Sequence, residues 1–217
     1  MAYRLIIGTR NTSSWSLRPY MALRHIGAKF SVEIIQLRRE TTSQALQMRT
    51  PAGRVPVLEI AENGTVYSVW DSLSICESLA ERHPDARLWP EDAKTRAIAR
   101  SYAAEMHSSF ADLRAQLPMD FARELPAPAL SDATKAQIAR ILFAWSEALA
   151  QHSHAGGFLF GRFSVADCMY APVVSRFLTY GIALPPVVRT YCENIAALPA
   201  MLDWARGAQE EIDTGLA

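Results

Sequence analysis

The sequence predicts two domains of different class: a mixed α/β domain over residues 1–83 and an all-helical domain over residues 92–217. Strand-like and helix-like patterns alternate through the first third of the chain, which is typical of an α/β sheet. After a linker over residues 84–91 that holds two prolines, strand patterns disappear and apolar residues recur at helical spacing. A length of 217 residues, of which 50% are hydrophobic, suffices for the core of one large domain or of two small ones.

The first domain is predicted to follow the order strand, helix, strand, helix, strand, strand, helix. Its first helix stops at Gly27, and its last two strands flank Asn63-Gly64, a pair typical of tight hairpin turns. Helices between the early strands favour parallel pairing, and the hairpin adds an antiparallel edge. The elements are expected at residues 3–8, 15–26, 30–37, 42–48, 57–60, 66–69 and from 71 onward.

The second domain is predicted to be helical throughout. Ser164, followed by Asp167 at the third position, has the form of a capping box, and Pro172 predicts a kink in the helix that follows. Further helices are expected over residues 131–151, 187–197 and 199–212. One long helix that ends at Pro118 is predicted by an apolar stripe made of Ile98, Tyr102, Met106, Phe110, Leu113 and Leu117.

Charge and cysteine content argue against several classes of function. Lysine plus arginine equals aspartate plus glutamate at 22 each, so no net charge favours nucleic acid or an anionic membrane as a partner. No apolar run is long enough to span a membrane, and the first residues lack a signal-peptide layout. The three cysteines lie far apart without a Cys-x-x-Cys pair. We therefore expect a cytoplasmic protein that holds no metal.

Ser13 and Ser14 lie where the first strand is expected to end and the first helix to begin. A helix N-terminus offers unpaired N–H groups and a partial positive charge, which suit an anion such as a thiolate. A free thiol has a pKa of about 8.5, and a charge-assisted hydrogen bond of roughly 1.5–3 kcal/mol lowers it by one or two units. The alternative, favoured by this segment taken alone, is that these hydroxyls only cap the helix.

Two further segments place polar groups at the same edge of the predicted sheet. A cis Val55-Pro56 bond would free the Val55 main chain to pair with a peptide-like ligand, although a trans bond is the commoner state. Asp71 and Ser72 suit an ammonium and a carboxylate, or simply cap the third helix. Arg54 suits a second carboxylate, or is a solvated surface charge. Glutathione carries all of these groups: a thiol, a peptide backbone, an ammonium and two carboxylates.

These segments resemble the signature points of the cytosolic glutathione S-transferases, and the resemblance spans nearly the whole chain. It implies a thioredoxin-like N-terminal domain, a helical C-terminal domain and a homodimer. The Ser-Ser-x-Ser-x-Arg pattern is similar to the zeta class, which includes maleylacetoacetate isomerases, and implies Ser13, or else Ser14, as the thiol-activating serine. Trp15 stands where zeta enzymes carry cysteine, which counts against isomerase activity. The segments concerned are residues 12–18, 53–58, 71–72 and 164–167.

The resemblance also implies which residues bind glutathione. Val55 is the residue whose backbone pairs with the cysteinyl unit, and Pro56 is the cis-proline. Arg54 meets the glycyl carboxylate, whereas Asp71 and Ser72 hold the γ-glutamyl end.

An apolar acceptor pocket is expected in the second domain, with Trp15 at the seam. Met106, His107 and Phe110 are candidates for its lining, unless the apolar side chains take core positions and the histidine a surface or hydrogen-bonded position. We predict that the protein conjugates the glutathione thiolate to small hydrophobic electrophiles. The alternatives are glutathione-dependent isomerisation or peroxide reduction, and an interaction protein that uses a transferase fold without turnover.

Overall fold

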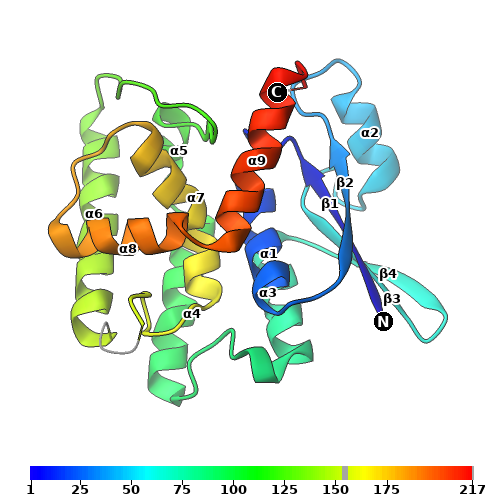
Figure 1. The fold of residues 1–217 in the computed structure, drawn as a ribbon, viewed down its shortest axis with the longest axis horizontal. Helices are drawn as coiled ribbons and strands as arrows, with labels where there is room; N and C mark the ends of the chain where they lie inside the picture. The colour runs from blue at the N-terminus through cyan, green and yellow to red at the C-terminus, as the bar shows by residue number, and fades with distance from the viewer. Residues whose placement is uncertain (153–155, 217) are drawn as a thin grey trace.

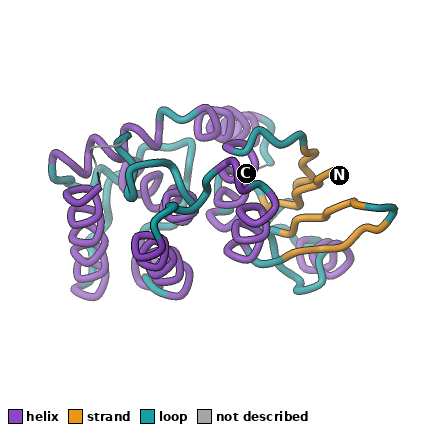
Figure 2. Tube along the Cα trace, turned by 90° about the horizontal axis from the view of Figure 1, so that it is seen from below, coloured by secondary structure: helices purple, strands orange, loops and turns teal. Residues whose placement is uncertain are grey.

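A computed structural model describes residues 1–152 and 156–216 of the chain. The four strands gather at one end of the molecule, and long helices fill the other end (Figure 1; Figure 2). Strands are confined to the first third of the described chain, apart from isolated bridges at residues 158–162. This arrangement confirms the predicted combination of an α/β part and a helical part.

The sheet has the strand order β2-β1-β3-β4. β1 (Ala2–Gly8) pairs in parallel with β2 (Phe30–Ile35) and antiparallel with β3 (Val57–Glu62). β3 forms a hairpin with β4 (Thr65–Val69) through Asn63-Gly64, where both residues have positive φ. The predicted parallel pair and hairpin are thus confirmed.

Three helices accompany the sheet: α1 (Ser14–His25), α2 (Thr42–Arg49) and α3 (Ser72–Arg82). The end of α1 is followed by Gly27 in the left-handed conformation, as the sequence indicates. The sequence predicts both ends of α1 and α2, and each of these ends lies within two residues of its expected position.

The rest of the described chain is helical. A short 3₁₀ turn, η1 (Pro84–Ala86), occupies the expected linker. None of the helices in the described ranges combines the length and the apolar character that a membrane span needs. The helices are α4 (Ala93–Ser108), α5 (Ala111–Gln116), α6 (Asp132–His152), α7 (Val165–Thr179), α8 (Pro186–Ala196) and α9 (Pro199–Asp213).

The prediction of one long helix ending at Pro118 is wrong, because the helix is broken in two. α4 ends at Ser108, and Phe110 adopts a left-handed conformation with φ of 64° before α5 begins. Met106 and Leu113, on either side of the break, are both fully buried. Apolar periodicity records which side chains face the core, and it persists across a break in the backbone hydrogen bonds.

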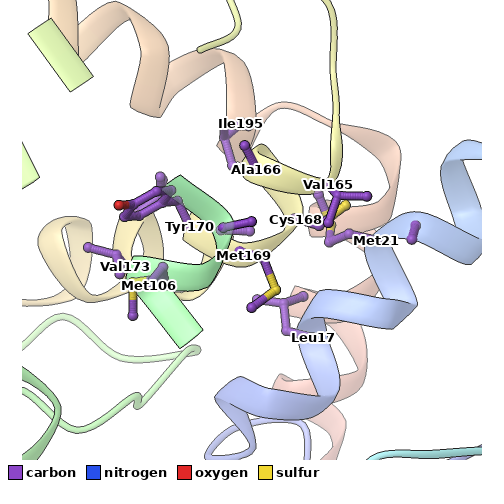
Figure 3. Close-up of a cluster of buried hydrophobic side chains, with 14 of the residues drawn as sticks. Leu17, Met21, Met106, Val165, Ala166, Cys168, Met169, Tyr170, Val173 and Ile195 are labelled. Atoms are coloured by element: carbon purple, nitrogen blue, oxygen red, sulfur yellow. The ribbon is translucent and has the colours of Figure 1, made fainter. Parts of the chain in front are cut away.

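The hydrophobic core is continuous between the two parts of the chain. Leu17 and Met21 of α1 belong to one buried cluster with side chains of α4, α7 and α8, several of which Figure 3 shows together. α7 is buried along almost its whole length and contains Pro172. α1 starts at Ser14 and has Ser13 as its N-cap residue. This packing therefore anchors the helix at whose start the two predicted catalytic serines lie.

The predicted capping box at the start of α7 is confirmed. The backbone N–H groups of Ser164 and Leu159 donate to the Asp167 carboxylate at 2.8 and 3.2 Å. Asp167 is fully buried, and this desolvation raises the pKa of its carboxyl group to about 6.

Candidate active site

A cavity of about 330 Å³ lies where the sheet end of the molecule meets α4. Seven of the eleven site residues that the sequence predicts line it, and they come from segments as far apart as α1 and α4. Two lining residues, Ala52 and Trp70, are not predicted from the sequence, although each directly neighbours a predicted segment. The lining consists of Trp15, Ala52, Arg54, Val55, Pro56, Trp70, Asp71, Ser72 and His107.

The segment before β3 forms one wall of this cavity. The Val55–Pro56 peptide bond is cis, although trans is the commoner state of such bonds. Pro56 is buried, whereas Arg54 is exposed. The segment therefore brings the chain just before β3 and an exposed arginine to the cavity.

Asp71 and Ser72 form the neighbouring part of the wall, at the N-terminus of α3. One Asp71 carboxylate oxygen accepts a hydrogen bond from Leu73 N at 3.1 Å, so this residue does cap the helix. The other oxygen lies 3.0 Å from His107 Nε2. Ser72 is fully buried, and its hydroxyl has no partner among the described residues. An unpaired buried hydroxyl beside helix N–H groups is a preformed site for an anionic group.

Ser13 and Ser14 are buried at the start of α1 and stand beside this wall rather than in it. Ser13 Oγ lies 2.7 Å from Ser16 Oγ, which in turn accepts a hydrogen bond from Gly8 N at 3.1 Å. Ser13 occupies the N-cap position of α1 without a side-chain capping bond. Simple capping of the helix therefore does not account for the Ser13 hydroxyl.

Trp15 connects these serines to the cavity and to a group of cations. The guanidinium carbons of Arg18 and Arg114 lie 4.2 and 5.3 Å from the centre of its ring, and the His107 ring packs edge-on at 5.4 Å. Arg18 Nε and Nη1 and Arg114 Nη1 are buried and have no hydrogen-bond partner in the described ranges.

Arg176 of α7 lies in the same cluster of cations as Arg18 and Arg114, although nothing in its local sequence predicts this. Burial, followed by repulsion from Arg176 and Arg114, lowers the pKa of Arg18 to about 9. Burial and repulsion from Arg114 lower the pKa of Arg176 to about 10. Three mutually repelling guanidinium groups thus create a region of positive potential behind Trp15.

The two remaining acceptor-pocket candidates occupy the core. Met106 is fully buried and Phe110 is 6% exposed, and both pack in the main hydrophobic cluster rather than line this cavity. His107, one position along from Met106, is the residue of this helix that reaches the cavity. Within the described residues, no cluster of three or more histidine, cysteine, aspartate or glutamate side chains is placed to hold a metal ion.

Comparison with known proteins identifies the family. The model of the glutathione S-transferase N-terminal domain matches residues 12–82, and that of the glutathione S-transferase C-terminal domain matches residues 128–207. The chain belongs to the glutathione S-transferase family. The family assignment accounts for the thioredoxin-like N-terminal part with its four-stranded sheet and for the helical C-terminal part.

Relatives of this transferase-family chain include proteins named as isomerases. A probable maleylacetoacetate isomerase of Caenorhabditis elegans is 28% identical over 210 residues, which cover 95% of this chain and 94% of the relative. A maleylacetoacetate isomerase of Rattus norvegicus is 34% identical over 92 residues, which cover 42% of this chain and 41% of the relative.

Solved structures agree with this family fold. The maleylacetoacetate isomerase of Anaeromyxobacter dehalogenans, crystallised with glutathione in its active site, is 29% identical with a TM-score of 0.69 over 94% of both chains. A glutathione transferase homologue from Burkholderia, also with bound glutathione, has a TM-score of 0.71 at 22% identity, covering 97% of this chain and 99% of its own. At that identity the second similarity concerns the fold alone.

Proposed function

We propose that this protein binds glutathione in the cavity at the N-terminus of α3 and conjugates its thiolate to small electrophiles. The observation that carries the proposal is the fully buried Ser72 hydroxyl, unpaired within the described residues, which lines the cavity at a helix N-terminus beside Asp71. A carboxylate placed there accepts hydrogen bonds from the hydroxyl and from the N–H groups of the first turn. A structurally similar protein that is 29% identical, the maleylacetoacetate isomerase of Anaeromyxobacter dehalogenans, holds glutathione in its crystal.

The proposed binding mode uses each part of the cavity for one part of the tripeptide. Ser72 and the first turn of α3 hold the γ-glutamyl carboxylate, and Asp71 holds the adjacent ammonium. The Val55 main chain, at the cavity wall, pairs with the cysteinyl unit. The solvated guanidinium of Arg54 meets the glycyl carboxylate. This arrangement directs the thiol toward Trp15 and the start of α1.

We further propose that Ser13 stabilises the thiolate, with Ser14 as the alternative donor. The Ser16 hydroxyl already accepts from Gly8 N, so its own proton is free to donate to Ser13 Oγ. The Ser13 proton then remains available for the sulfur. This pair gives the zeta-like Ser-Ser-x-Ser-x-Arg motif a physical role, since its first and third serines are the two that interact.

The test compares Ser13→Ala with Ser14→Ala. Loss of one charge-assisted hydrogen bond of roughly 1.5–3 kcal/mol should raise the pKa of the bound thiol by one to two units. The turnover of a chlorodinitrobenzene-type substrate at neutral pH should fall accordingly, while the dissociation constant of glutathione measured by calorimetry changes little. If Ser14→Ala alone shows this behaviour, Ser14 is the donor. If affinity and turnover fall together in both variants, neither serine activates the thiol.

A second function, glutathione-dependent cis–trans isomerisation, is favoured by the cations around Trp15. Arg18 is buried behind Trp15, whereas Arg114 beside the same ring is half-buried, and their positive charge would attract an acceptor that carries a carboxylate. The relatives named maleylacetoacetate isomerase point the same way, whereas Trp15 at the cysteine position of the zeta class does not. Turnover of maleylacetone with catalytic amounts of glutathione would establish this activity.

Peroxide reduction and a non-catalytic role are each tested by a separate experiment. Consumption of glutathione with an organic hydroperoxide would indicate peroxide reduction. An intact fold that shows no glutathione binding by calorimetry would indicate an interaction protein. We also propose a cytoplasmic homodimer, which light scattering of the purified protein and fractionation of the cells that express it would test.

A further inference from the structure

The loop that carries Ser13 is held from the other end of the chain. We define the serine loop as residues 9–13, between β1 and α1. The carboxylate of Glu211, in the last turns of α9, accepts hydrogen bonds from the backbone N–H groups of Arg10 at 2.9 Å and Asn11 at 3.0 Å. Figure 1 shows α9 running alongside α1. The residues in these bonds are about 200 positions apart in sequence.

Further contacts from the helical part hold the same two loop residues. Trp204 Nε1 of α9 donates to the Arg10 carbonyl at 2.9 Å. The Asn11 side chain donates to Asp120 Oδ1 at 2.8 Å and accepts from Ala122 N at 3.0 Å. Each backbone N–H of Arg10 and Asn11 is therefore satisfied by a residue outside the α/β part of the molecule.

Because Arg10 and Asn11 are held in place, the position of Ser13, the predicted catalytic serine, is also restrained. Ser13 N donates to the Thr9 carbonyl at 2.8 Å, so the serine loop closes on itself around the two residues that Glu211 holds. Glu211 is only 4% exposed, which makes its charge-assisted bonds to the backbone strong and directional. Removing that carboxylate would leave two backbone N–H groups unpaired and free the loop to move.

We propose that Glu211 is a positioning residue, which holds the serine loop so that the Ser13 hydroxyl reaches the glutathione sulfur. This inference rests on the proposed function and adds to it a dependence of thiol ionisation on the C-terminal helix. Val55, Asp71 and Ser72 are not part of the loop, so Glu211 affects the ionisation of bound glutathione more than its affinity.

The test is Glu211→Gln, which keeps the side-chain shape but replaces one acceptor oxygen by a donor that faces an N–H group. We expect the pKa of the bound thiol, followed by the ultraviolet absorbance of the thiolate against pH, to rise by about one unit, with turnover at neutral pH falling about tenfold. The dissociation constant of glutathione should change less than about twofold. A general loss of structure would not separate these two quantities.

Two matched controls on the same helix define the effect. Glu210→Gln alters an exposed carboxylate one residue away and should leave the thiol pKa unchanged. Gly207→Ala places a methyl group 2.6 Å from the Arg10 side chain, which must shift, and leaves the Glu211 carboxylate in the chain. It should therefore also retain the thiol pKa.

A measurement on the unmodified protein guards against a variant that does not fold. The amide protons of Arg10 and Asn11 should exchange with solvent as slowly as those of α9, because both depend on the same contact. Rapid exchange of the two amides would overturn the proposal, and so would a folded Glu211→Gln protein with an unaltered thiol pKa while Ser13→Ala raises it. If Ser13→Ala itself has no effect, the assignment of Ser13 fails instead.

Discussion

The two walls of the cavity differ in how they are built and in what they offer a ligand. The wall proposed to hold the tripeptide, called the tripeptide wall and formed by Val55, Asp71 and Ser72, comes from one short stretch of chain and offers the segment before β3 and a helix N-terminus. The acceptor wall, formed by Trp15 and His107 with Arg18 and Arg114 behind them, draws on α1, α4 and α5 and offers positive charge. Under the proposed function, the first wall would recognise one zwitterionic peptide, whereas the second would select acceptors by charge and impose less shape.

The strongest test of the tripeptide wall is Ser72→Ala. Loss of a charge-assisted hydrogen bond to the carboxylate should weaken glutathione binding by roughly tenfold to hundredfold, since such bonds contribute about 1.5–3 kcal/mol. The ligand-free protein should be equally stable or more stable, because the buried hydroxyl has no partner among the described residues. Calorimetry and thermal unfolding measure the two effects, with Ser74→Ala, an exposed serine of the same helix, as the control. Weaker binding together with lower stability would indicate a structural role.

The acceptor wall is tested by Arg114→Met, which keeps much of the side-chain volume and removes the charge. Turnover of an acceptor with a carboxylate should fall about tenfold, while that of a neutral acceptor stays the same, because only the former pairs with a guanidinium. The control is Arg189→Met, at an exposed position on α8. Equal loss with both acceptors would show that Arg114 only supports the packing of Trp15.

The same wall predicts a pH-dependent effect on stability through Arg18. Its pKa is about 9 in the folded protein, against an ordinary value of 12.5, so the unfolded chain binds more protons between these values. Its burial therefore destabilises the protein fully below pH 9, and stability recovers as the pH rises above it. Arg18→Met should raise the free energy of unfolding at neutral pH by about 1 kcal/mol.

This advantage of Arg18→Met should shrink between about pH 9 and about pH 10.5, as denaturant titrations at several pH values would show. An advantage that is constant over this range would mean that packing, rather than charge, causes it.

The smallest expected effect concerns the contact between the two walls, His107 with Asp71. The Asp71 side chain is 52% exposed, and ion pairs of that kind contribute at most about 1 kcal/mol. His107→Ala should therefore change glutathione affinity by less than about threefold in a fluorescence or calorimetric titration. A larger change would mean that the walls act as one unit.

The elements and the tripeptide wall follow closely from local sequence. Asn63-Gly64 predicts the hairpin, and Ser164 with Asp167 predicts the start of α7, because turns and caps satisfy their hydrogen bonds within a few residues. The one wrong element, the helix broken at Phe110, shows the limit of this reasoning. The periodic burial of the side chains continues across this break, although the helical hydrogen bonding of the backbone does not.

The sequence by itself determined the fold class, the family and the segments that meet in the cavity before β3 and at the start of α3, since each depends on patterns spanning a few residues. Only the tertiary structure decided that Arg114 and Arg176 join Arg18, that Met106 and Phe110 pack in the core, and that Glu211 holds the serine loop. The physical reason is that a charged side chain looks the same in sequence whether it is solvated or buried. Its role depends on which distant segments the packing of α1, α5, α7 and α9 brings beside it.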